Sequence, residues 1–109
     1  MKEYHEQGAL TEAVYYILLS LYEPMHGYGI MQNIKEMSDG RVLLGAGTLY
    51  GAINTLLKKE WIKSVSNDEA SRKKEYQITA VGVEIVNQEI ARLEELIKNG
   101  RTIAGGGLS

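Results

Sequence analysis

Three glycines follow a short apolar run near the middle of the chain, in the segment RVLLGAGTLYGAINTLLKK (residues 41–59). They are Gly45, Gly47 and Gly51, and an amphipathic helical pattern goes with them. A strand, a glycine turn and a helix in this order are typical of a dinucleotide-binding unit, where backbone amides hold a pyrophosphate. The segment is equally compatible with the start of a DNA-reading helix. The two hypotheses predict different folds around it.

Two amphipathic helices are expected before the glycine segment. Apolar residues recur at helical spacing over residues 9–22, which Pro24 ends, and over residues 27–37, which the polar sequence SDG follows. After the glycines the helical pattern continues to about Glu60. The period then changes, because residues 61–66 and 73–79 are short and rich in β-branched and aromatic residues. They predict an antiparallel hairpin with a flexible, charged tip, NDEASR.

A long helix is expected after the hairpin, with Thr79 as its N-cap and Asn99 and Gly100 as its stop. A strap across its own domain is one interpretation of this helix. Pairing across a two-fold dimer is favoured, because the apolar seam exceeds what a three-helix core requires. The seam follows the coiled-coil spacing of three and four residues over two heptads and consists of Val83, Val86, Ile90, Leu93 and Ile97.

The order of these elements argues against the dinucleotide-binding fold. Helices rather than strands precede the glycines, and the roughly 40 residues after Asp68 are too few for the other parallel strands. The order instead predicts a mainly helical α+β protein. Its winged helix-turn-helix domain would span residues 9–79, a dimerisation helix residues 80–100 and a loose tail residues 101–109. In such a domain the third helix enters the DNA major groove.

Positive charge is concentrated where this fold would meet DNA. Residues 40–79 carry seven Lys or Arg and four acidic residues, whereas the whole chain has a net charge of −2. A solvated charged surface is the alternative interpretation. The exposed face of the third helix is expected to carry groups that bond to base edges or phosphates, and a glycine that lets the backbone approach the groove: Thr48, Gly51, Asn54, Thr55 and Lys58. The other candidates for phosphate contacts are Lys59, Arg72, Lys73 and Lys74.

Several classes of protein are disfavoured. The chain has no cysteine, and neither His5 nor His26 has a second ligand at helical or turn spacing, so no metal or other cofactor is expected. The longest apolar stretch, residues 13–22, is about half of a membrane-spanning helix. The N-terminus does not resemble a signal peptide. We therefore expect a cytoplasmic protein without membrane association.

Three motifs in this order resemble the PadR family of winged-helix transcriptional regulators: HGYGIMQNI (26–34), GTLYGAINTLLKKEWI (47–62) and RKKEYQIT (72–79). The resemblance covers residues 9–100, and the single short last helix is similar to that of the smaller subgroup. It implies a homodimer whose partner is double-stranded DNA. The family often has Ser-Pro before GTLY and Pro after it, whereas this chain has Gly45, Ala46 and Gly51. Base preference therefore cannot be carried over.

The resemblance also implies roles for single residues. Tyr28 and Tyr50 correspond to aromatic residues near DNA, although Tyr50 could equally pack against the first helix. His26 and Gly27 are expected to shape the turn before the second helix. Some relatives sense aromatic drugs or phenolic acids with aromatic side chains of the last helix, but this chain has no aromatic residue after Tyr76. A small-molecule effector of unknown identity stays an open alternative.

The hypothesis that follows is a homodimeric transcriptional regulator that represses by occupying a palindromic operator. The alternative from another class is a winged-helix dimer that binds proteins and no DNA. A small nucleotide-binding enzyme is disfavoured by the order of the elements, so no enzymatic activity is expected.

Overall fold

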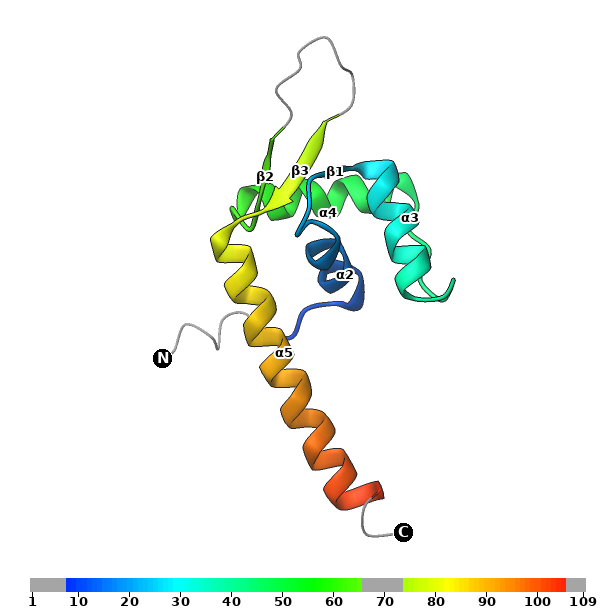
Figure 1. Ribbon diagram of the computed structural model, residues 1–109, viewed down its shortest axis with the longest axis vertical. Helices are drawn as coiled ribbons and strands as arrows, with labels where there is room; N and C mark the ends of the chain where they lie inside the picture. The colour runs from blue at the N-terminus through cyan, green and yellow to red at the C-terminus, as the bar shows by residue number, and fades with distance from the viewer. Residues whose placement is uncertain (1–7, 66–73, 106–109) are drawn as a thin grey trace.

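A computed structural model of the protein describes residues 8–65 and 74–105. Helices dominate and a small antiparallel sheet lies at one end, so the predicted fold class is confirmed (Figure 1). The elements in chain order are α2 (Glu12–Ser20), β1 (Met25–His26), α3 (Gly27–Met37), α4 (Ala46–Lys58), β2 (Ile62–Ser64), β3 (Glu75–Ile78), α5 (Ala80–Gly100) and a π-helical turn, η1 (Arg101–Gly105).

The core lies where the helices meet. Helix α2 contacts both α3 and α5, and α3 contacts α4. One polar contact supplements the apolar packing, since Asn33 Nδ2 donates a hydrogen bond of 3.0 Å to Ser20 Oγ across α2 and α3. The fully buried side chains fall on the helical spacings seen in the sequence. Those of the three short helices and their ends are Ile17, Leu18, Leu21, Ile30, Ile34, Leu49, Ile53 and Leu56.

The sheet has the strand order β1-β3-β2, with both pairs antiparallel. Strands β2 and β3 form the predicted hairpin, although both are shorter than expected. Strand β1 was not predicted, and its Met25 and His26 pair with Tyr76 and Glu75 of β3. This pairing places the start of α3 beside the β2–β3 hairpin, which is the wing of a winged helix-turn-helix domain. The expected hairpin tip lies outside the described residues.

The ends of α2 and the end of α4 differ from the predicted ones by two or three residues, whereas α3 has the predicted bounds. Helix α2 begins after Thr11, whose side chain accepts a hydrogen bond of 3.1 Å from the Val14 amide. Helix α4 has Gly45 as its N-cap and therefore no side-chain capping bond. It ends at Lys58 rather than near Glu60, because Glu60 takes a left-handed conformation with φ of 64°.

Thr79 joins the last helix to the end of α4. As predicted it is the N-cap of α5, where its Oγ1 accepts a hydrogen bond of 3.1 Å from the Gly82 amide. The same hydroxyl donates to the Glu60 carbonyl at 2.7 Å, and the Thr79 amide donates to the Trp61 carbonyl at 2.9 Å. A Cβ at Gly82 would overlap that Trp61 carbonyl oxygen. The first turn of α5 is therefore packed tightly against the turn that follows α4.

Helix α5 has two halves with different surroundings. Its first half packs on the domain, and its second half projects away from it (Figure 1). Val86, assigned to the dimer seam from sequence, is 1 % exposed and belongs to the core of its own domain. The α-helix ends at Gly100, as expected, but Arg101–Gly105 follow as the π-helical turn η1, where a loose tail was expected. The rest of the expected tail, residues 106–109, lies outside the described residues.

Candidate nucleic-acid interface

One face of α4 is exposed. Leu49, Ile53 and Leu56 point into the core, which turns the opposite face outward. All five residues expected on that face are exposed: Thr48, Gly51, Asn54, Thr55 and Lys58. A Cβ at Gly51 would meet no atom within 4 Å, so packing within the domain does not require a glycine there.

The polar groups on this face differ in what they can still bind. The Thr55 hydroxyl donates to the Gly51 carbonyl at 3.2 Å, which leaves its oxygen as an acceptor. The Asn54 carboxamide has two donors and an acceptor and can form paired hydrogen bonds with the edge of a base. Together these groups match the chemistry of a major groove.

Two lysines end α4 in different environments. Both are exposed, and a positive charge at a helix C-terminus is favourable in itself. The Lys59 ammonium lies 5.1 Å from the ring centroid of Trp61, a cation–π distance. Trp61 is buried in the core. Lys59 therefore has a structural contact.

The wing contributes one described candidate. Lys74 lies next to β3 and is exposed. Arg72 and Lys73, the other two cations assigned to the wing, lie outside the described residues. Of the three consecutive cations Arg72, Lys73 and Lys74, the structure thus describes the position of Lys74 alone.

The start of α3 presents Tyr28. Its side chain is 63 % exposed in the first turn of the helix. His26 is the N-cap, and its Nδ1 accepts a hydrogen bond of 3.2 Å from the Gly29 amide. The expectation that His26 shapes this turn is therefore confirmed. Backbone amides at a helix N-terminus favour anions, so a phosphate near Tyr28 would be well placed.

Tyr50 is partly covered by its own domain. Its phenol reaches the start of α3, where a Cβ at Gly27 would overlap the Tyr50 hydroxyl. Burial, and in second place the Tyr50 phenol, raise the pKa of Tyr76 on β3. Tyr50 thus has an intramolecular contact with the start of α3.

An ion pair supports the turn that leads into α4. Arg41 Nη1 donates to Glu12 Oε1 at 3.2 Å, and both side chains are largely exposed. The hydrogen bond from Arg41 lowers the Glu12 pKa, and Glu12 raises the Arg41 pKa. Arg41 belongs to the basic middle of the sequence, but its charge is compensated by α2.

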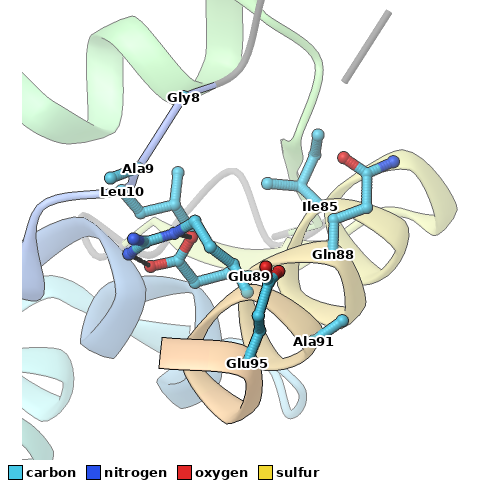
Figure 2. Close-up of a pocket in the computed structure, with 9 residues that line it drawn as sticks. Gly8, Ala9, Leu10, Ile85, Gln88, Glu89, Ala91 and Glu95 are labelled. Carbon is cyan, nitrogen blue, oxygen red and sulfur yellow. Dashed lines mark hydrogen bonds and ion pairs between the residues drawn. The ribbon is translucent and has the colours of Figure 1, made fainter. Parts of the chain in front are cut away.

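A cavity of about 450 Å³ lies between residues 8–10 and α5 (Figure 2). Glu89 lies in its wall and is 5 % exposed, yet it carries a negative charge. Its oxygens accept hydrogen bonds from Arg92 Nη2 at 2.6 Å and Nε at 3.0 Å. These bonds are the main cause of a lowered Glu89 pKa, and the Leu10 amide adds to it. No aromatic residue is among those lining the cavity in the described part of the chain.

Other kinds of site find no support in the described residues. In residues 8–65 and 74–105 no three His, Asp or Glu side chains gather as metal ligands would. No helix there has the length and apolar character needed to cross a membrane.

The arrangement defines a class of protein. A helix with an exposed polar face stands beside a β-hairpin, and a second helix of the same domain presents its N-terminus next to it (Figure 1). This is the architecture of winged helix-turn-helix proteins that bind DNA.

Comparison with known proteins identifies the family. The model of the transcriptional regulator PadR-like family matches residues 15–88, more than half of the chain. The protein therefore belongs to the PadR-like family of DNA-binding transcriptional regulators, and the resemblance seen in the three motifs is confirmed. A search of curated proteins found no match.

Solved structures agree with this assignment. A transcriptional regulator from Clostridium thermocellum is 27 % identical with a TM-score of 0.70, over 85 % of this chain and 92 % of that one. A PadR family regulator from Clostridium difficile is 25 % identical with a TM-score of 0.69, over 84 % and 98 %. A PadR-like transcription factor from Bacteroides fragilis has a TM-score of 0.71 at 24 % identity, over 94 % and 97 %, and supports the fold alone.

Proposed function

We propose that this protein is a homodimeric transcriptional repressor that places α4 in the major groove of a palindromic operator. The observation that carries the proposal is the outward face of α4. It combines exposed hydrogen-bonding side chains with an uncovered backbone at Gly51. Packing inside the domain explains neither feature, whereas close approach to base edges requires both.

The phosphate contacts are assigned to the groups that flank this face. Tyr28 lies at the N-terminus of α3, Lys58 lies at the C-terminus of α4, and Lys74 lies next to β3 of the wing. Arg72 and Lys73 are assigned the same role from sequence. Lys59 has the weaker claim, since Trp61 already holds its ammonium group.

The dimer is assigned to the projecting half of α5. Ile90, Leu93 and Ile97 lie at coiled-coil spacing beyond the part of the helix that the domain covers. Two-fold pairing of these residues would present two copies of α4 to half-sites about one DNA turn, roughly 34 Å, apart. Occupation of such an operator would block transcription.

The test is binding to DNA from upstream of the protein's own gene, measured by fluorescence anisotropy over a salt series. Affinity should fall steeply with salt. Lys58→Glu or Lys74→Glu should flatten the logarithmic slope by about one unit for each phosphate that the variant no longer neutralises. Asn54→Ala should weaken binding by about 1–3 kcal/mol and relax base preference at one position.

Lys98→Glu is the matched control, because Lys98 is exposed on α5 away from the α4 face. It should leave both affinity and slope unchanged. A wild-type protein that binds neither upstream nor unrelated DNA would contradict the proposal and favour the alternative, a winged-helix dimer that binds proteins.

A further inference from the structure

The phenol of Tyr50 occupies the space that a side chain at position 27 would need. A Cβ at Gly27 would overlap the Tyr50 hydroxyl and lie 2.6 Å from its Cζ. Gly27 is buried, and it is not among the glycines with positive φ, so its backbone conformation does not demand a glycine. The contact with Tyr50 is therefore the feature that requires a glycine at this position.

The same phenol has a neighbour on the wing. Tyr76 of β3 is 6 % exposed and lies close enough for the Tyr50 phenol to help raise its pKa. Tyr76 pairs with Met25 of β1, two residues before Gly27. Tyr50 thus belongs to α4 and contacts the start of α3 where β1 joins that start to the wing.

Two parts of the proposed DNA-binding surface therefore meet at the Tyr50 side chain, the face of α4 and the start of α3 with exposed Tyr28. The wing is joined to the same place through β1, which pairs with β3 directly before α3 begins. The ring is a rigid body with two rotatable bonds, so its position limits how α3 and β3 can lie against α4.

We propose that Tyr50 is a positioning residue for DNA binding. It holds the start of α3 and the wing at the angle to α4 that the duplex requires, with Gly27 as the seat for its ring. This inference rests on the proposed function and differs from the place near DNA that the family resemblance implied for Tyr50. Tyr50 acts through Gly27 and the start of α3, and its hydroxyl makes no necessary bond to DNA.

Two substitutions of Tyr50 separate positioning from direct contact. Tyr50→Phe keeps the ring and removes the hydroxyl, whereas Tyr50→Leu removes the ring. Affinity for the upstream DNA should change by less than about threefold in Tyr50→Phe and fall by about tenfold or more in Tyr50→Leu. If the two variants lose affinity equally, the hydroxyl contacts DNA and the proposal is wrong.

A double-mutant cycle tests the seat itself. Gly27→Ala should weaken DNA binding by about tenfold in the wild-type background, because the ring must leave its place. In the Tyr50→Leu background the space is empty, so Gly27→Ala should add less than about twofold. Gly29→Ala is the matched control in the same helical turn, since its Cβ would meet the flexible Met25 side chain at 3.1 Å from Cγ and His26 Cε1 at an ordinary contact distance of 3.7 Å.

The melting temperature of every variant is measured with the affinity. Should Gly27→Ala alone fail to fold, recovery of folding and of binding to the Tyr50→Leu level in the double variant supports the inference. Additive losses in the cycle overturn it. A wild-type protein that binds no DNA would instead contradict the proposed function, and the inference would fall with it, so the two failures are distinguishable.

Discussion

Glu89 is a buried acidic residue of α5. An acidic side chain in the polar part of a long helix is typical of a solvated face. In the structure it is 5 % exposed, and its charge is compensated by Arg92 and by the Leu10 amide. A buried carboxylate is tolerated only with such partners. Glu89 thus lines the same cavity as Leu10, where the segment before α2 lies beside α5.

Glu89→Gln should lower the melting temperature at neutral pH, because hydrogen bonds to a charged group contribute about 1.5–3 kcal/mol. The folded-state pKa of Glu89 lies below the ordinary value of 4.5. Its contribution is therefore complete above about pH 4.5 and is lost as the pH falls through the folded pKa. The difference between wild type and variant in thermal unfolding should shrink below that pH.

Glu94→Gln is the control for this experiment, since Glu94 lies exposed on the same helix. It should change the melting temperature little at any pH. An equal effect of both variants would mean that the charge of α5, and not the buried bonds of Glu89, controls stability.

At the scale of elements, strong helical periodicity made α3 and the start of α5 predictable to the residue. Thr79 was recognisable as an N-cap because a hydroxyl there has a local role. Strand β1 was not recognisable, since two residues carry no periodicity. Met25 and His26 are extended because β3 pairs with them from about 50 residues away in the sequence. The exposed face of α4 was predicted correctly, whereas the seat of Tyr50 on Gly27 depends on tertiary packing.

Gly51 is expected to lower the stability of α4 and to strengthen DNA binding. A helical glycine costs about 0.5–1 kcal/mol relative to alanine, and a Cβ at this position would meet nothing within 4 Å. Gly51→Ala should therefore raise the melting temperature by roughly 4 °C. It should also weaken operator binding, because the new methyl group would stand between α4 and the groove.

Gly100→Ala provides the comparison, because Gly100 is also helical and also has open space around its Cα. It should stabilise the protein without changing its affinity for DNA. If Gly51→Ala also leaves affinity unchanged, close backbone approach at position 51 is not part of recognition.

At the scale of the whole molecule, the main feature is the unpaired half of α5. The first turns of the helix are covered by the domain, but Ile90, Leu96 and Ile97 are 37 %, 51 % and 53 % exposed. Apolar side chains in a row on a projecting helix are unfavourable in water and indicate a partner surface. The sequence pattern could not separate the covered part of the seam from the exposed part, since apolar residues recur every three or four positions in both parts of the helix.

Leu93→Glu with Ile97→Glu should convert the proposed dimer into a folded monomer, as measured by sedimentation. The monomer should bind operator DNA far more weakly, because it can occupy one half-site only. Val81→Glu is the control, since Val81 is 51 % exposed on the same helix but off the seam. A seam variant that sediments as wild type would contradict this interface.

The junction at Thr79 has a consequence for such a dimer. Hydrogen bonds from Thr79 to the Glu60 and Trp61 carbonyls connect α5 rigidly to the turn after α4. In a dimer the angle at which the two α5 helices cross would therefore determine the distance between the two copies of α4, because each domain would move as a rigid body with its α5. A molecule that altered this angle by a few degrees would change the half-site spacing that the dimer can bind, without contacting any group on the DNA-facing surface.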